Sequence, residues 1–159
     1  MGLFMFGKKK SKKEDNSSLA VDEKQQDLLA EEKNDMIQGV EDLSVTTVKE
    51  VMVPRIDVDF ISIETPEEEL LKRVTESGHS RFPVYSGSID NVVGVLYVKD
   101  LIKAFANRQS VDLERIIRKA YFVPESKRID GLLREFKRKH LHIAIAIDEY
   151  GGISGIVCM

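Results

Sequence analysis

The chain has 159 residues, of which 42% are hydrophobic and 32% are charged. The hydrophobic side chains are numerous enough for one core of ordinary size or for two small modules that share an interface. Its unbroken apolar runs are only a few residues long, far short of the ~20 residues that a membrane-spanning helix needs. The single cysteine excludes an internal disulfide and a thiolate metal cluster. The net charge of -3 does not favour nucleic acid as a partner.

The charge is uneven along the first 50 residues. Residues 1–13 carry five lysines and no acid, whereas residues 14–50 carry eleven acids and three lysines. We expect residues 1–26 to form a disordered basic and polar tail. The apolar cluster Leu3–Phe6 is too short for a secretory signal and precedes the lysines, so we expect no export. Alternatively, this cluster and the lysines could rest on an anionic membrane surface.

Residues 27–44 alternate apolar side chains with acids at approximately helical spacing. The apolar positions are Leu28, Leu29, Met36, Ile37, Val40 and Leu43. This spacing predicts one or two short amphipathic helices as a lead-in to the rest of the chain.

Short strands and helices alternate from about residue 45. Residues 58–63 are rich in β-formers and predict a strand. A helix should follow, with Thr65 as the N-cap, Pro66 at its first position and Gly78 at its end.

The next segment predicts a hairpin and another helix. Residues 81–85 and 92–98 are β-rich and flank a polar connection at residues 86–91. Asp100 is the expected N-cap of the helix after the hairpin.

The same order recurs downstream, which indicates an internal repeat. Gly94 and Gly155 occupy equivalent positions 61 residues apart, and the same offset aligns the hairpins without a gap. Ser126 is the expected N-cap of the second copy's main helix. Each copy is a βαββα unit with a small sheet, and must bury its open face on the other copy. The second copy ends at Met159, before a helix equivalent to the one after Asp100, so we expect it to be incomplete.

Four segments of the repeats resemble one protein family. They are Val51–Arg55 (VMVPR), His79–Val84 (HSRFPV), Val123–Arg128 (VPESKR) and Ile147–Gly155 (IDEYGGISG). Together they resemble the tandem CBS (cystathionine-β-synthase-type) domains of CorC-like magnesium and cobalt efflux proteins, also called hemolysin-like. The resemblance implies an α+β fold in which two CBS repeats, residues 45–108 and 109–159, pack as a pseudo-dimer.

The resemblance also implies clefts that bind adenine nucleotides. In the family, a cleft combines residues of one repeat with a Gly-x-x-Thr-x-x-Asp motif of the other. The residues that match these positions are Val53, His79, Arg81, Tyr97, Asp100, Ile156 and Cys158. Cys158 and Tyr97 depart from the family pattern, because each stands where a Thr hydroxyl is usual. The chain also ends before the Asp that would complete the second motif.

On this resemblance we predict a cytoplasmic regulatory protein that binds ATP or AMP, with Mg²⁺ as an optional companion, and influences magnesium and cobalt efflux. The implied partners are a second copy, forming a homodimer through the CBS pairs, and a membrane transporter. We expect no nucleic acid and no covalently bound cofactor. An alternative location is the inner face of the plasma membrane. An alternative function is a structural or interaction fragment that binds no nucleotide.

Motifs for catalysis or metal binding are weak. The segment Gly152–Ile156 lacks the final glycine of a Gly-x-Ser-x-Gly elbow, and His140 and His142 have no obvious third ligand. Asp148 and Glu149 precede two glycines, as a hairpin turn requires. Spacing alone would also allow Arg81 to form a surface salt bridge. We therefore predict neither an enzyme nor a metal site.

Overall fold

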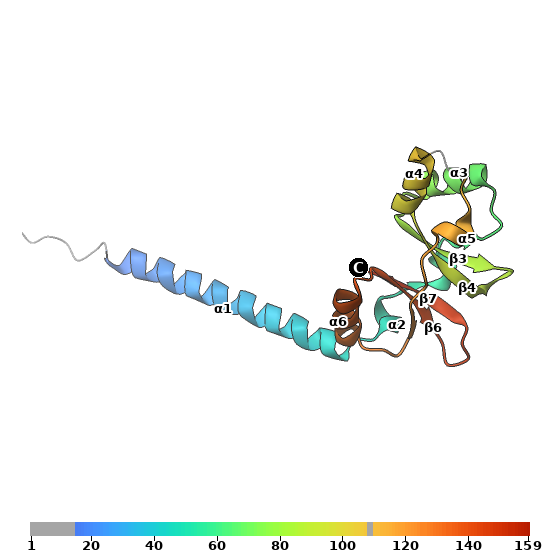
Figure 1. The fold of residues 1–159 in the computed structure, drawn as a ribbon. Helices are drawn as coiled ribbons and strands as arrows, with labels where there is room; N and C mark the ends of the chain where they lie inside the picture. The colour runs from blue at the N-terminus through green and yellow to red at the C-terminus, as the bar shows by residue number, and fades with distance from the viewer. Residues whose placement is uncertain (1–14, 108–109) are drawn as a thin grey trace, which may run out of the picture. The chain divides into compact units, whose positions relative to one another are not determined.

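The computed structural model describes residues 15–107 and 110–159, with side chains described from residue 24 onward (Figure 1). The chain divides into two units, Met1–Asp42 and Leu43–Met159. The predictions for residues 1–14, including the membrane alternative, lie outside the described part.

A single long helix occupies most of the acidic N-terminal region. Helix α1 (Asp15–Val45) has 31 residues and replaces both the predicted disorder of residues 15–26 and the predicted short helices. Residues 19–33 are mostly Leu, Ala, Glu, Gln and Lys, whose summed helix propensity favours an unbroken helix. Neither α1 nor any other helix within residues 15–107 and 110–159 is long and apolar enough to cross a bilayer.

The first repeat forms a three-stranded sheet with helices beside it. Its elements are β2 (Ile61–Ser62), α3 (Glu67–Ser77), β3 (Arg81–Ser86), β4 (Ser88–Tyr97) and α4 (Val98–Ala106). Strand β3 lies between β2, which is parallel to it, and β4, which is antiparallel. Figure 1 shows α3 and α4 beside the β3–β4 hairpin.

The second repeat forms a four-stranded sheet that includes a short strand from the start of the first repeat. The sheet order is β1–β7–β6–β5. Its elements are β1 (Val53–Pro54), β5 (Phe122–Pro124), α6 (Ile129–Lys139), β6 (Ile143–Ile147) and β7 (Ile153–Cys158). Three short helices complete the chain: α2 (Val48–Val51), η1 (Arg55–Asp57) and α5 (Leu113–Ile116).

The strand register confirms the internal repeat. Ile61 pairs with Val84 in the first sheet, and Phe122 pairs with Ile145 in the second. Both residues of the second pair lie 61 positions after their counterparts in the first. The α+β fold of two equivalent units is therefore as predicted.

The short helices are exchanged between the repeats. Val48 of α2 is fully buried among second-repeat side chains such as Phe136, and its N–H donates to Lys127 O at 2.8 Å. Leu113 of α5 is buried in the core of the first repeat, with Phe82. Each core is thus completed by the helical turn at the start of the other repeat.

A separate core lies between the two repeats. It includes Val95 and Tyr97 of β4 together with Ile145 and Ile156 of the second sheet. Alternate residues of the same strands, such as Leu96, face the helices instead. This period of two allows each sheet to pack on its helices and on the other repeat.

Some helix starts differ from the predictions. Pro66, rather than Thr65, is the N-cap of α3, although Gly78 ends this helix with φ 68° as predicted. Helix α4 begins at Val98, so Asp100 lies in its first turn, where its carboxylate accepts hydrogen bonds from Arg118 instead of capping the helix. Helix α6 begins at Ile129, beyond the predicted cap Ser126.

Candidate functional site

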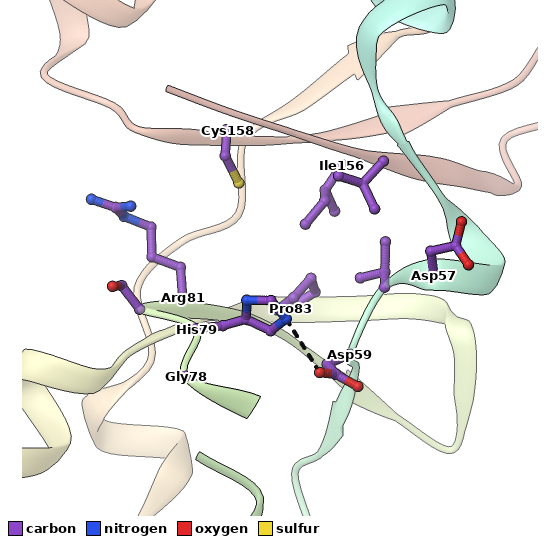
Figure 2. Close-up of a pocket in the computed structure, with 11 residues that line it drawn as sticks. Asp57, Asp59, Gly78, His79, Arg81, Pro83, Ile156 and Cys158 are labelled. Carbon is purple, nitrogen blue, oxygen red and sulfur yellow. Dashed lines mark ion pairs between the residues drawn. The ribbon is translucent and has the colours of Figure 1, made fainter. Parts of the chain in front are cut away.

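A cleft of about 390 Å³ opens between the repeats (Figure 2). Its walls come from β1, the end of η1 and the segment after it, the α3–β3 connection, β3 and β7. The lining residues are Val53, Asp57, Val58, Asp59, Gly78, His79, Ser80, Arg81, Pro83, Ile156 and Cys158. The cleft depends on both copies, because β7 belongs to the second repeat and β3 to the first.

Five of the seven residues that the family resemblance selected lie around this cleft. They are Val53, His79, Arg81, Ile156 and Cys158. The other two, Tyr97 and Asp100, do not line it. The predicted site residues did not include Gly78, Ser80 and Pro83, which are next to or near predicted ones, or Asp57, Val58 and Asp59, which follow β1.

A length difference between the repeats could have pointed to the last three of these residues. Val53 pairs with Ile156, and Arg118 forms the equivalent bridge with Val95. Eight positions separate Val53 from Ile61 at the start of β2, but only four separate Arg118 from Phe122 at the start of β5. The first repeat uses its longer segment for η1 and the adjoining wall of the cleft.

Arg55 anchors η1 to both repeats. Its guanidinium donates to the two carboxylate oxygens of Asp90 at 2.7 and 3.2 Å. Asp90 also accepts a hydrogen bond from the N–H of Ile153 at 3.1 Å, which joins β4 to β7. The pKa of Asp90 is lowered by this backbone hydrogen bond and by Arg55. These bonds hold the cleft wall in place.

Arg81 lies at one end of the cleft, below Cys158 in Figure 2. Its Nε atom is buried and has no hydrogen-bond partner in the part of the chain that the structure describes. Its guanidinium carbon is 5.4 Å from the centre of the Tyr97 ring. A buried donor without a partner carries a desolvation cost that an anionic ligand could offset.

Acidic side chains lie toward the other end of the cleft. Figure 2 shows Asp57 and Asp59 on the side away from the Arg81 guanidinium. Asp59 Oδ2 is 3.5 Å from Nε2 of His79, whose ring meets Phe82 edge-on. Valine, proline and isoleucine side chains line the middle. The cleft thus has a cationic end, an apolar centre and an acidic end.

Cys158 contributes the only thiol of the chain, and its side chain points into the cleft (Figure 2). Burial of the sulfur raises the pKa of the Cys158 thiol above its ordinary 9.0, an effect that the positive charge of Arg81 partly opposes. The thiol is therefore protonated at neutral pH and is a weak hydrogen-bond donor.

Tyr97 and Asp100 lie together around Arg118. Nε and Nη2 of Arg118 donate to the Asp100 carboxylate at 2.7 and 3.0 Å. The guanidinium carbon of Arg118 is 4.4 Å from the centre of the Tyr97 ring. The hydrogen bonds from Arg118 hold the pKa of Asp100 below its ordinary value.

The remaining candidates have structural roles. Asp148 Oδ1 accepts hydrogen bonds from the N–H groups of Tyr150 and Gly152 at 2.9 and 2.8 Å, so turn formation accounts for this acid, as predicted. His140 ends α6 with φ 53° and, like His142, lies outside β6. Among the described side chains, those of residues 24–107 and 110–159, no three His, Cys, Asp or Glu side chains form a group that could hold a metal ion.

The exchanged repeats and the cleft between them define a tandem CBS-domain module. A family profile for the CBS domain matches residues 48–107. Among solved structures, the CBS domain of a bacterial CNNM/CorC family Mg²⁺ transporter in complex with ATP is similar, with a TM-score of 0.74 and 37% identity. That match covers 80% of this chain and 91% of the other.

Curated relatives point to the same family. Magnesium and cobalt efflux protein CorC of Escherichia coli K12 is 39% identical over 141 residues, covering 88% of this chain and 48% of CorC. Hemolysin C of Brachyspira hyodysenteriae is 44% identical over 131 residues, covering 82% and 48% respectively. The chain belongs to the CorC-like, hemolysin-like family of CBS-domain proteins. It spans about half the length of the curated relatives it matches.

Proposed function

We propose that this chain is a cytoplasmic, non-enzymatic regulatory module that binds ATP or AMP in the cleft between its repeats and thereby influences magnesium and cobalt efflux. The observation that carries this proposal is Arg81, whose buried Nε has no partner among the described residues and whose side chain lines the cationic end of the cleft. A guanidinium presents a planar set of donors suited to phosphate oxygens. The ATP complex of a similar CBS domain supports the choice of nucleotide.

The apolar centre of the cleft suits a nucleobase. Val53, Pro83 and Ile156 offer aliphatic surface, which can pack on a purine while Arg81 contacts the phosphates. In this arrangement His79 lies beside the ligand, and Cys158 stands close to the ribose or phosphates. Tyr97 and Asp100 are left out of this site.

The acidic end of the cleft gives Mg²⁺ a role. Asp57 and Asp59 repel a nucleotide polyphosphate that enters without a counterion. Mg²⁺ bound to the phosphate oxygens would reduce this repulsion, because its positive charge offsets part of the negative charge of the polyphosphate. We therefore expect Mg²⁺ to strengthen ATP binding more than AMP binding, since AMP carries fewer negative charges.

A homodimer through the CBS pairs is part of the proposal. Helices α3 and α4 border an apolar groove of about 380 Å³, where Leu71 is 38% exposed and Ile102 is 61% exposed. A second copy placed here would cover both side chains. A membrane transporter is the proposed target of the module, through which nucleotide binding would change ion flux.

Titration calorimetry with ATP and AMP, with and without Mg²⁺, tests the nucleotide site. In the absence of Mg²⁺, Asp57→Asn should tighten ATP binding by roughly two- to fivefold, the equivalent of ~0.4–1 kcal/mol and within the range for an exposed charge interaction. Glu68→Gln changes the net charge equally on the exposed surface of α3 and serves as the control. No binding of either nucleotide to the wild-type chain would instead support the structural or interaction role.

A further inference from the structure

The pseudo-symmetry of the repeats creates a second cleft position. In the first cleft, Val53 pairs with Ile156 of β7. In the second, the N–H of Val95 donates to Arg118 O at 2.8 Å, and the N–H of Arg118 donates to Val95 O at 2.9 Å. Arg118 therefore occupies in the second cleft the backbone position that Val53 occupies in the first.

The Arg118 side chain fills this second position with an ion pair. Its guanidinium makes two hydrogen bonds to Asp100, at 2.7 and 3.0 Å, and lies over the ring of Tyr97. The Asp100 side chain is only 20% exposed, whereas the Arg118 side chain is 48% exposed. Arg118 thus covers the carboxylate from the solvent side.

We propose that Arg118 is a built-in occupant that keeps nucleotides out of the second cleft, so that each chain binds a single nucleotide. This inference rests on the proposed function. A nucleoside in the second cleft would need the Asp100 carboxylate as an acceptor for ribose hydroxyls and the Tyr97 ring as a stacking surface. The guanidinium already uses both groups.

Displacing Arg118 would be unfavourable. Entry of a nucleotide would exchange a two-point charge-assisted contact for hydrogen bonds to neutral hydroxyls, which are weaker. The guanidinium would also lose its contact with the Tyr97 ring. Val53 presents no such obstacle in the first cleft, because its side chain is aliphatic and needs no polar partner.

Counting ATP sites tests this inference. Equilibrium dialysis with radiolabelled ATP in the presence of Mg²⁺ should give one site per wild-type chain and two per Arg118→Ala chain. The Arg81→Ala, Arg118→Ala double variant should keep the new site while its first site weakens tenfold or more. Arg115→Ala is the matched control, since Arg115 lies in the same linker and its side chain is 86% exposed. This control should retain one site.

The outcomes separate this inference from the proposed function. One site in both the wild type and a folded Arg118→Ala variant overturns the inference and leaves the proposed function intact. Two sites in the wild type have the same meaning. No site in the wild type and one in Arg118→Ala supports the inference and overturns the proposed function. No site in either protein overturns both. Circular dichroism verifies folding, and Arg118→Gln, which keeps the aliphatic stem, replaces Arg118→Ala if that variant does not fold.

Discussion

The carbonyl oxygen of Val53 passes so close to Gly155 that a Cβ on this glycine would lie 2.1 Å from it. Gly155 lies on β7 of the second repeat, and Val53 belongs to the segment at the start of the first repeat. The same relationship recurs at Gly94, where a Cβ would lie 2.8 Å from the carbonyl oxygen of Arg118. Both glycines are needed because a strand of one repeat is crossed by the segment that introduces the other.

Substitution of Gly155 should destabilise the fold. We expect Gly155→Ala to lower the free energy of unfolding by ~1–3 kcal/mol or more, because the added methyl group must displace backbone rather than a flexible side chain. Urea denaturation followed by circular dichroism measures the effect. Gly131→Ala is the control: no atom lies within 4 Å of a Cβ there, and alanine in helix α6 should stabilise by ~0.5–1 kcal/mol. Equal stability of the two variants would contradict the close approach.

Loss of the Arg81 guanidinium should weaken nucleotide binding. We expect Arg81→Ala to reduce ATP affinity by ~1.5–3 kcal/mol, the range for a hydrogen bond to a charged group. This corresponds to roughly tenfold to a hundredfold in the dissociation constant, measured by titration calorimetry. Arg138→Ala removes an equal charge from the exposed end of α6 and should leave the affinity unchanged. Unchanged affinity in Arg81→Ala would show that the phosphates bind elsewhere.

The single thiol provides a probe of the cleft. Iodoacetamide should alkylate Cys158 slowly at pH 7 and faster as the pH rises, because the thiolate is the reacting form and burial raises the pKa of this thiol. ATP bound in the cleft should slow the alkylation further, as measured by mass spectrometry. In denaturant the protection should vanish. An alkylation rate that saturating ATP leaves unchanged would place the nucleotide outside this cleft.

A hydroxyl at position 158 should raise the affinity for ATP, whereas loss of the Arg81 guanidinium should lower it. Cys158→Thr replaces a weak sulfur donor by a hydroxyl that can both donate and accept. We expect ATP affinity to rise by roughly the ~0.5–1.5 kcal/mol of a neutral hydrogen bond. Cys158→Val, which has a similar shape without the hydroxyl, is the control for calorimetry. An equal gain in both variants would attribute the effect to packing.

Stability should fall in acid as Asp100 becomes protonated. Its hydrogen bonds with Arg118 hold the pKa of Asp100 below the ordinary 3.8. The stabilisation is therefore complete above the unfolded-state pKa and is lost as the pH falls through the lower folded-state pKa. Urea denaturation between pH 7 and pH 2 should show a smaller loss of stability for Asp100→Asn than for the wild type. Arg118→Ala should reduce the loss similarly, whereas an unchanged profile in both variants would contradict the coupling.

The sequence selected five residues that line the first cleft, but it did not predict that Tyr97 and Asp100 lie outside this cleft. The family motifs selected Val53, His79 and Arg81 together with Ile156 and Cys158, and the structure places these five residues around one cleft. They placed Tyr97 and Asp100 in the same functional group, although Asp100 accepts hydrogen bonds from Arg118 and the Tyr97 ring lies near the guanidinium groups of both Arg118 and Arg81. Arg118 lies in a linker whose length differs between the repeats, so comparison of the copies does not reveal its role.

The sequence by itself determined the repeat, the order of its strands and helices and the faces that are buried, because these follow from local hydrophobic periods and turn residues. Only the tertiary structure decided which copy completes which core. Val48 lies at the start of the first repeat but is buried in the core of the second, and Leu113 lies at the start of the second but is buried in the core of the first. The hydrophobic pattern of each short helix would be the same whether it packed on its own repeat or on the other one. The choice therefore depends on long-range packing of the segments around Val53 and Arg118, which pass where Gly94 and Gly155 leave room.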